Sequence, residues 1–300
     1  MFGLNPDSEW LKPKFQLDNP PLKEVEIQLV SWCNRSCDFC PSRKIANPKK
    51  NMSLETINII TTQLEGIKFA GMIGLHLMSE PLLHPNFPQI VADFRRRLPG
   101  AFLRIESNGD VLKDWHQLQS YFHVGLNEIL INCYDSPEQL ERRNAMILEL
   151  LKADPTVWYW NMHGRFPPPP NHQWRAIKLR RFYEDNYTLR NWAGHVPSQR
   201  PEKLDFPLPL SCARPFNRLH INYLGQAILC NNDWENKLVA GDLRHEDLRK
   251  VWNAPLLRQY REHLLRKDRS LLLCASCDSG IPFAIEPQCP RIPISQSDSE

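Results

Sequence analysis

Three cysteines near the start of the chain carry its most specific chemical signal. Cys33, Cys37 and Cys40 have the spacing C-x3-C-x2-C. Three thiolates this close together can hold three irons of a 4Fe–4S cube and leave the fourth iron open. An open iron can bind a substrate or a cofactor, whereas four protein ligands would close the site. The spacing also fits three ligands of a zinc site, or reduced structural thiols.

The segment before these cysteines is predicted to be a strand, because residues 24–31 alternate with period 2. The cysteine loop therefore begins where that strand ends. Downstream, strand and helix patterns alternate, with Ser53 as a predicted N-cap. Further strands are expected at residues 72–77, 101–106, 128–133 and 157–160, and helices at 54–66, 87–98, 112–122 and 136–152.

This rhythm of elements predicts right-handed βαβ units around a parallel sheet. Such a sheet carries its chemistry at the C-terminal ends of its strands. The cysteine loop lies at such an end, and polar residues follow the next three strands. These are Ser79-Glu80-Pro81, Ser107-Asn108-Gly109 and Asn132-Cys133-Tyr134-Asp135.

The cysteine run and these strand ends resemble the signature of the radical S-adenosylmethionine (SAM) enzymes. In that family the open iron chelates the amino and carboxylate groups of SAM, and the reduced cluster cleaves SAM to a 5′-deoxyadenosyl radical. The resemblance implies an α/β fold with a partial (β/α)6 TIM-like barrel. Five βα units are recognisable, and the sixth is expected within residues 165–195.

The resemblance also implies which residues contact SAM. Phe39 would pack near the adenine, and Glu80 would accept a hydrogen bond from the SAM amino group. Ser107 and Asn108 would lie near SAM, although Asn-Gly is also a common plain turn. Asn132 aligns with a serine that touches SAM in relatives.

One departure from the family pattern lies beside Glu80. The family commonly has Gly-Gly-Glu-Pro there, and this chain has Met78 and Ser79 in place of the glycines. We therefore expect the backbone, or its approach to SAM, to differ slightly at this strand end.

A second cysteine set lies in the last third of the chain: Cys212, Cys230, Cys274 and Cys277. Gly225 marks a turn between two alternating segments, so Cys212 and Cys230 can meet across a hairpin. Helices are expected at about 248–252 and 256–265. The layout resembles the α+β twitch domain, a short SPASM domain whose four cysteines ligate a second 4Fe–4S cluster in radical SAM enzymes. A four-cysteine zinc site has the same ligand set.

These signals divide the chain into four parts. We expect an N-terminal extension over residues 1–23, the barrel over 24–200, the twitch/SPASM-like domain over 201–283 and a flexible, Pro-rich tail over 284–300.

Two cysteines remain outside both sets. Cys133 could donate a hydrogen atom to a substrate radical, or it could be a small buried residue. If Asn132 faces the cofactor, alternation turns Cys133 toward the helices, which favours the second interpretation. Cys289, in the Pro-rich tail, is interpreted as a plain thiol.

Several polar residues near probable strand ends are candidate substrate contacts. Asn161, His163 and Arg165 follow an aromatic segment, and solvated polar tips on a packed barrel wall explain them equally well. Arg190 and Asn191 belong to a stretch that resembles an Asn-Arg-Ala-Gly segment of relatives.

Composition limits the remaining possibilities. The chain has 300 residues, 42% hydrophobic and 24% charged, and a net charge of +3, which gives no argument for a nucleic-acid partner. It has no apolar run long enough for a membrane span and no recognisable signal peptide, so we expect a cytoplasmic protein in which cysteines serve as ligands or thiols.

Three functions follow for comparison. The first is oxidation of a small alcohol, sugar or aminocyclitol, because the second cysteine set is spaced like that of a radical SAM dehydrogenase acting on a secondary alcohol. The second is modification of a ribosomally made peptide by crosslinking, epimerisation or thioether formation. The third is a non-enzymatic metal-bound scaffold. The enzymatic hypotheses require SAM, two 4Fe–4S clusters and a low-potential electron donor such as flavodoxin or ferredoxin.

Overall fold

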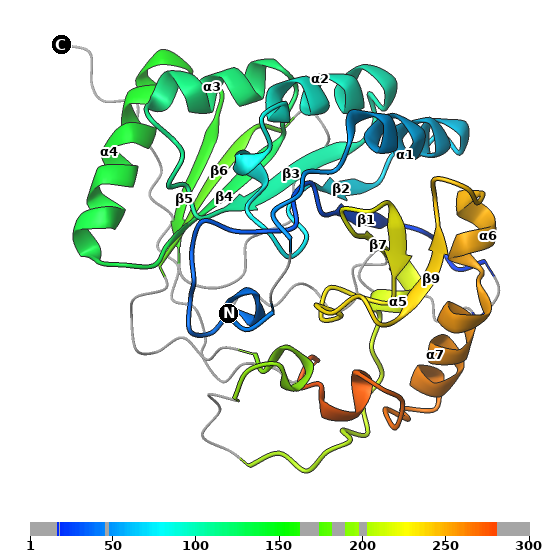
Figure 1. Cartoon of the computed structure of the whole chain (residues 1–300). Helices are drawn as coiled ribbons and strands as arrows, with labels where there is room; N and C mark the ends of the chain where they lie inside the picture. The colour runs from blue at the N-terminus through cyan, green and yellow to red at the C-terminus, as the bar shows by residue number, and fades with distance from the viewer. Residues whose placement is uncertain are drawn as a thin grey trace.

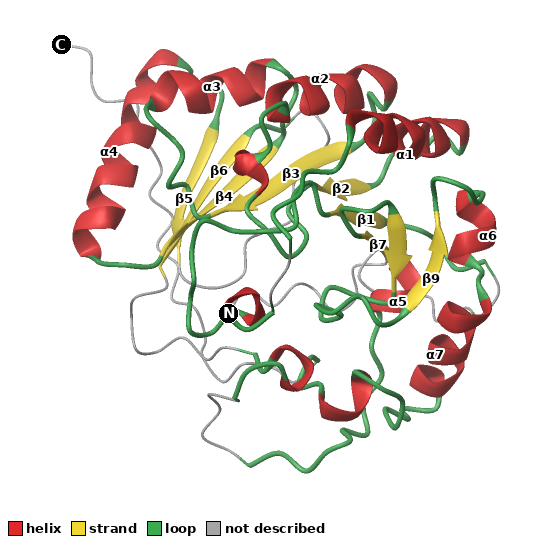
Figure 2. Cartoon of the chain, viewed as in Figure 1, coloured by secondary structure: helices red, strands yellow, loops and turns green. Residues whose placement is uncertain are grey.

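The structure is a computed structural model, and Figures 1 and 2 show the arrangement of its elements. It describes residues 17, 19–45, 48–162, 174–181, 190–197 and 203–280. In chain order the strands are β1 (Glu24–Ile27), β2 (Met72–Gly74), β3 (Phe102–Ser107), β4 (Glu128–Cys133), β5 (Trp158–Met162), β6 (Ala176–Arg181), β7 (Arg218–Ile221), β8 (Gln226–Ile228) and β9 (Val239–Asp242). The α-helices are α1 (Leu54–Gly66), α2 (Phe87–Arg97), α3 (Trp115–His123), α4 (Pro137–Ala153), α5 (Arg214–Asn217), α6 (Leu248–Trp252) and α7 (Pro255–Leu265).

The described strands form one sheet in the order β5-β6-β4-β3-β2-β1-β7-β8-β9. Neighbours from β5 to β7 are parallel, and the last two pairings are antiparallel. The α/β fold is therefore confirmed. The sixth strand, β6, lies within the predicted residues but is inserted between β4 and β5. Its Ile177 and Leu179 are completely buried, whereas Trp158 on the edge strand β5 is 57% exposed, which explains why β6 takes the interior position.

Helices α1 to α4 cover one face of the parallel part of the sheet (Figure 1). Alternate strand residues such as Ile105 and Ile129 pack beneath them in the main hydrophobic core. Helix α1 begins as predicted, with the Ser53 side chain accepting a hydrogen bond from the Thr56 amide. Among the described residues, no helix has the length and apolar composition needed to span a membrane.

Two strands are shorter than the sequence pattern predicts. Strand β1 ends at Ile27 rather than at residue 31, although Val30 still forms an isolated antiparallel bridge with Asn51. Strand β2 covers only Met72–Gly74 of the predicted segment 72–77. After each of these two short strands the backbone leaves the sheet, and the polar segment that follows turns across the end of the sheet.

The other face of the parallel strands carries charged side chains that the sequence pattern did not assign to an interior. Lys178 Nζ lies 2.7 Å from Glu128 Oε2, and both side chains are nearly inaccessible. On β7 and β1, which pair with each other, Arg218 Nε lies 2.9 Å from Glu24 Oε2. Buried charges need such partners, because desolvation of an unpaired charge costs several kcal/mol. The polar residues that alternate with the core therefore pair with one another.

The C-terminal region extends the same sheet from the β1 edge. Strand β7 pairs in parallel with β1, with Glu24 opposite Arg218. The predicted hairpin follows, and Gly225 adopts φ +83° at its turn, a conformation that favours glycine. Helices α6 and α7 then lie beyond β9 (Figure 2).

The buried pair offers a first test of this account. We expect Lys178→Met to lower the free energy of unfolding in urea by about 3 kcal/mol, because Glu128 loses its closest cationic partner in the interior. Lys152 forms an equally short pair with Glu149 on the exposed surface of α4, so Lys152→Met is the matched control and should cost less than about 1 kcal/mol. Equal losses in the two variants would contradict the account.

Candidate functional site

The first cysteine loop follows β1 at the C-terminal end of the sheet. Cys33, Cys37 and Cys40 are unpaired and partly exposed, and the Cys40 amide donates to the Cys37 carbonyl over 3.1 Å. Burial, together with the neighbouring Cys40 and Cys33, raises the pKa of Cys37 to about 11. The three thiols thus lie within electrostatic range of one another, and an iron cluster would favour their deprotonated form.

Arg35, between the first two cysteines, ties the loop to two other strand ends. Its guanidinium contacts Asp110 after β3 through Nε at 2.6 Å and Nη2 at 2.8 Å. It also contacts Asp135 after β4 through Nη1 at 2.6 Å and Nη2 at 2.8 Å. The two carboxylates hold the pKa of Arg35 well above its ordinary value. These paired contacts fix the position of the loop relative to β3 and β4.

The Glu80 carboxylate accepts hydrogen bonds from Ser107 and Asn108, two other residues that are predicted to contact SAM. Its carboxylate accepts from Ser107 Oγ at 2.8 Å and from the Asn108 amide at 2.7 Å, and the Leu82 amide donates to it at 3.2 Å. Asn108 Nδ2 lies 3.6 Å from Cys33 Sγ and donates to Asn34 Oδ1 at 2.8 Å. The structure therefore brings Glu80, Ser107 and Asn108 together beside the cysteine loop.

The strand end that has Met78 in place of the family's glycine adopts a backbone conformation that favours glycine. Met78 adopts φ +51°, in the left-handed region that side chains rarely occupy. The backbone at Met78 is therefore held in a conformation that favours glycine. Glu80 itself is only 2% exposed.

The two remaining predicted SAM contacts lie at the same end of the sheet. The Phe39 ring lies 5.7 Å from that of Tyr134, which follows β4. Asn132 is 6% exposed and is paired in register with Arg180 of β6. Among the described residues no hydrogen-bond donor reaches Asn132 Oδ1, which leaves that oxygen available to a ligand.

The cysteines of the second set lie close enough to influence one another electrostatically, with Cys274 in range of the other three. Burial, together with Cys212 and Cys277, raises the pKa of Cys274 to about 12, and Cys230 lies within range of Cys277 and Cys274. The half-buried Arg214 guanidinium is influenced by Cys212, Cys230 and Cys277, so a cation lies among the thiols.

Hydrogen-bond donors surround these sulfurs. Asn232 directs its amide to Cys230 Sγ at 3.4 Å and its Nδ2 to Cys277 Sγ at 3.3 Å. The Ser279 amide also reaches Cys277 Sγ at 3.4 Å. Donors to the sulfurs are the contacts that stabilise thiolates and tune iron–sulfur clusters. Sequence reasoning missed Asn232 because only the fold brings it between two cysteines 47 residues apart.

A short 3-10 segment, η3 (Trp192–Gly194), connects the two cysteine groups. Trp192 Nε1 donates to the Phe39 carbonyl at 3.0 Å, and its ring packs edge-on at 5.9 Å against Trp234. On the other side, Ser276 Oγ donates to the Ala193 carbonyl at 2.7 Å. The segment therefore touches the residue before Cys40 and the loop between Cys274 and Cys277.

The residues predicted to contact substrate lie in different surroundings. Asn191 Nδ2 donates to the Ser276 carbonyl and its Oδ1 accepts from the Ala193 amide, so this side chain holds the second cysteine loop. Asn161 shares a face of β5 with Tyr159, which contacts Asn144 of α4, so it faces the helices. Arg190 is partly buried beside Asn191. His163, Arg165 and Cys289 lie outside the described residues.

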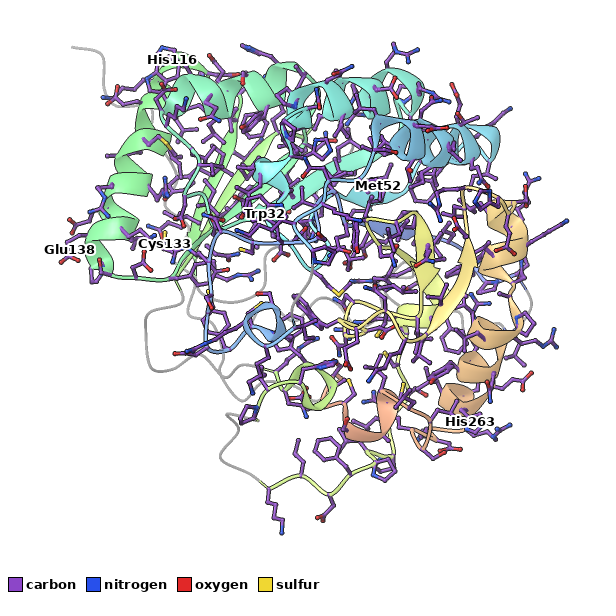
Figure 3. All side chains as sticks on the ribbon, viewed as in Figure 1. Trp32, Met52, His116, Cys133, Glu138 and His263 are labelled. Carbon is purple, nitrogen blue, oxygen red and sulfur yellow. The ribbon has the colours of Figure 1, made fainter. Side chains whose placement is uncertain are left out.

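Cys133 is completely buried in the hydrophobic core between the sheet and its helices (Figure 3). It faces away from Asn132, as strand alternation requires. The placement agrees with a small packed residue and gives no support to its role as a hydrogen donor.

Both cysteine sets fit iron–sulfur clusters in donor chemistry. No three His, Cys, Asp or Glu side chains in the part of the chain that the structure describes meet closely enough to enclose a single metal ion. A 4Fe–4S cube attaches each thiolate to a different iron, so its ligands need not meet at one point. The residues that would hold the two clusters are Cys33, Cys37 and Cys40, and Cys212, Cys230, Cys274 and Cys277.

Two protein-family models match the chain, and they coincide with the two cysteine sets. Residues 27–153 match the radical SAM superfamily. Residues 212–278 match SPASM, an iron–sulfur cluster-binding domain.

Individual relatives agree with this assignment. The chain is 23% identical over 261 residues to S-adenosyl-L-methionine-dependent 2-deoxy-scyllo-inosamine dehydrogenase of Niallia circulans, covering 85% of this chain and 92% of the relative. The crystal structure of BtrN in complex with AdoMet and 2-DOIA superposes with a TM-score of 0.69 at 22% identity, covering 86% and 94% of the two chains. SuiB of Streptococcus suis, bound to its precursor peptide SuiA, gives a TM-score of 0.55 at 11% identity, covering 81% and 67%. These structural likenesses establish the fold.

Arg35 provides a test of how the cysteine loop is positioned. We expect Arg35→Lys to weaken SAM binding to the iron-loaded protein about tenfold, because one ammonium group cannot replace paired contacts to both Asp110 and Asp135. Isothermal titration under anaerobic conditions measures the change. Arg43 contacts Asp38 on the exposed side of the loop, so Arg43→Lys is the control. Unchanged affinity in Arg35→Lys would refute the positioning role.

The raised pKa of Glu80 predicts that SAM binding depends on pH. Burial raises its pKa to about 7, whereas an unburied carboxyl would have a pKa of 4.5, so the folded protein keeps Glu80 protonated below about pH 7. Its ionisation therefore costs stability as pH rises from about 4.5 to 7, and a hydrogen bond donated by the amino group of bound SAM offsets that cost. SAM should bind more tightly at pH 8 than at pH 6.

The same titration in Glu80→Gln isolates the effect of this carboxyl from that of SAM's own amino group. The pH slope should become shallower in the variant. Parallel slopes in the two proteins would exclude Glu80 as the titrating group.

Proposed function

We propose that this chain, whose residues 27–153 match the radical SAM superfamily and whose residues 212–278 match the SPASM domain, is a dehydrogenase that oxidises a secondary alcohol of a small, polyhydroxylated substrate. The reaction class is abstraction of a hydrogen atom from carbon, followed by loss of the hydroxyl proton and one electron. The substrate class includes sugars and aminocyclitols.

One observation carries the radical SAM part of this proposal. The loop of Cys33, Cys37 and Cys40 meets Glu80 and Asn108 at the C-terminal end of the sheet, where Asn108 contacts both Glu80 and Cys33. This assembly combines three thiolate ligands with a buried carboxylate that can receive the SAM amino group. Phe39 and Asn132 border the same region.

Two bound 4Fe–4S clusters would supply the electron that cleaves SAM and an acceptor for the electron left on the oxidised substrate. The chain's own residues hold these groups in place. Arg35 orients the first loop, and Asn232 and Arg214 stabilise the thiolates of the second. Trp192 and Asn191 keep the two loops in contact.

The charged face of the sheet supports a polar, small-molecule substrate. Near the cysteine-loop end, Glu106 is about one-third exposed and lies 3.8 Å from Arg180. Desolvation raises the pKa of Glu106, but the neighbouring Arg180 and Arg104 outweigh it and hold that pKa low, at about 2, so the carboxylate stays ionised. An ionised carboxylate beside Asn132 can accept hydrogen bonds from hydroxyl or amino groups. The relative from Niallia circulans is named for an aminocyclitol of this kind.

The proposal also requires an external source of low-potential electrons, such as flavodoxin or ferredoxin. Peptide modification remains the second hypothesis of the sequence, and the superposition with SuiB supports a shared fold alone at 11% identity.

The experiment incubates the reduced, cluster-loaded protein with SAM and 2-deoxy-scyllo-inosamine deuterated at the carbinol carbons. We expect about one 5′-deoxyadenosine per ketone, with deuterium transferred into it, and no product from Cys33→Ala. Related alcohols and a generic peptide pool are assayed in parallel. Deuterium transfer from none of the alcohols, with 5′-deoxyadenosine formed only in the presence of peptide, would overturn the substrate class.

A further inference from the structure

A nearly inaccessible arginine joins two of the segments that carry the second cysteine set. Arg269 follows α7 and is 2% exposed. Its guanidinium donates to four backbone carbonyls at 2.7 to 3.1 Å, and these belong to Leu210, Ser211, Cys277 and Ser279. The first two lie directly before Cys212, and the other two lie at and after Cys277. Arg269 therefore lies between two of the cysteine-bearing segments and holds both in place.

These contacts do not neutralise the positive charge at the second set. Carbonyls are uncharged acceptors, so the hydrogen bonds of Arg269 leave its charge intact. A second arginine, the half-buried Arg214, donates Nη1 to the Ser279 hydroxyl at 3.0 Å, and this acceptor is also uncharged. Burial raises the pKa of Cys274, and Arg269 and Arg214 both oppose that rise, which places both cations within electrostatic range of this thiol.

The first cysteine set has a different arrangement of charge. Its arginine, Arg35, is paired with the carboxylates of Asp110 and Asp135. Beside the second set, Asp278 accepts a hydrogen bond from the Asn191 amide at 3.0 Å. Among these groups, the first set has one arginine with two carboxylates, whereas the second has two arginines with one carboxylate. The local charge is therefore more positive at the second set.

We propose that Arg269 and Arg214 raise the reduction potential of the iron–sulfur cluster that the second cysteine set would hold, and so make it an acceptor of the substrate's electron. A cluster held by four thiolates gains a further negative charge on reduction, so a cation in the protein interior stabilises its reduced form. The inference rests on the proposed function, in which the oxidised substrate gives up one electron. Both arginines act through the cluster and need not contact substrate.

The test measures the potential of the second cluster alone. Replacing Cys33, Cys37 and Cys40 by alanine in the full chain provides a background in which only that cluster assembles, and redox titration followed by electron paramagnetic resonance reports its potential. We expect Arg269→Met and Arg214→Met each to disfavour reduction about tenfold, which lowers the potential by about 59 mV for one electron. Arg269→Lys keeps the charge and should shift the potential less than Arg269→Met.

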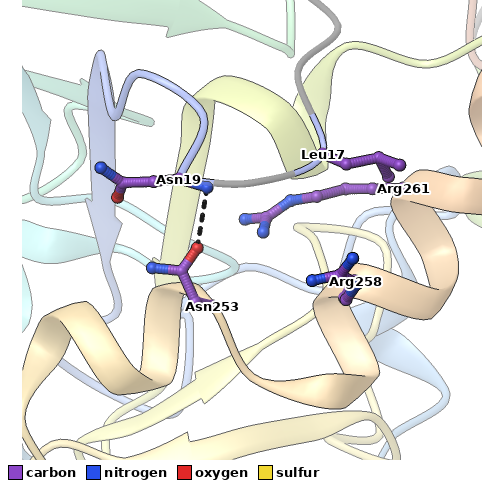
Figure 4. Close-up of a pocket in the computed structure, with 5 residues that line it drawn as sticks. All are labelled: Leu17, Asn19, Asn253, Arg258 and Arg261. Atoms are coloured by element: carbon purple, nitrogen blue, oxygen red, sulfur yellow. Dashed lines mark hydrogen bonds between the residues drawn. The ribbon is translucent and has the colours of Figure 1, made fainter.

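Arg261→Met is the matched control for the loss of a buried arginine. Arg261 lies on α7, is completely inaccessible and also donates to a backbone carbonyl, that of Pro215 at 2.7 Å. It lines a pocket with Asn253 and Arg258 (Figure 4). Burial lowers its pKa to about 10, with no influence from a cysteine of the described residues. Its replacement should therefore change the reduction equilibrium of the cluster less than twofold.

The outcomes separate this inference from the proposed function. Arg214→Met gives up a single hydrogen bond to Ser279, so it carries the test if Arg269→Met fails to load iron. Unchanged potentials in the loaded arginine variants, an equal shift in Arg261→Met, or equal shifts in Arg269→Met and Arg269→Lys would overturn the inference alone. A background protein that binds zinc in place of an iron–sulfur cluster would overturn the proposed electron acceptor, and the inference with it.

Discussion

The position of the first cysteine loop depends on Arg35. Among the described residues, the loop after β1 forms only one β-bridge, between Val30 and Asn51. The Arg35 guanidinium contacts Asp110 and Asp135 and so connects the loop to the ends of β3 and β4. Three thiolates can share one cluster only if their loop keeps a fixed shape, so an ionic clamp within the cysteine motif itself determines whether the motif can work.

Other contacts hold the second cysteine set in position relative to the first. Strand β7 continues the sheet from β1, and η3 lies between the two loops through Trp192 and Asn191. Movement of one loop would therefore disturb the other. This coupling suits a reaction in which a substrate bound near SAM must pass an electron to a second centre, because electron transfer depends on a fixed separation.

Local patterns predicted much of this fold. Ser53 as an N-cap, the glycine turn at Gly225 and most helix limits follow from short-range chemistry. The insertion of β6 could not be predicted, because the pairing partner of a strand depends on which edges are free after the other strands have assembled. Alternation in β1 correctly indicated two different faces, but it could not show that the polar face is interior and paired, as at Glu24 and Arg218. Within the site, the cysteine spacing and Glu80 were recognisable. Arg35, Asn232 and Trp192 were not, because their roles rest on contacts between distant segments.

The central claim is that two separate cysteine sets hold two iron–sulfur clusters. Iron, acid-labile sulfide and zinc per chain, measured after anaerobic reconstitution, test it most directly. The account predicts about eight irons with equal sulfide in the wild type, and about four in a variant with Cys33, Cys37 and Cys40 replaced by alanine. Full iron content in that variant, or about four irons with one zinc in the wild type, would contradict it.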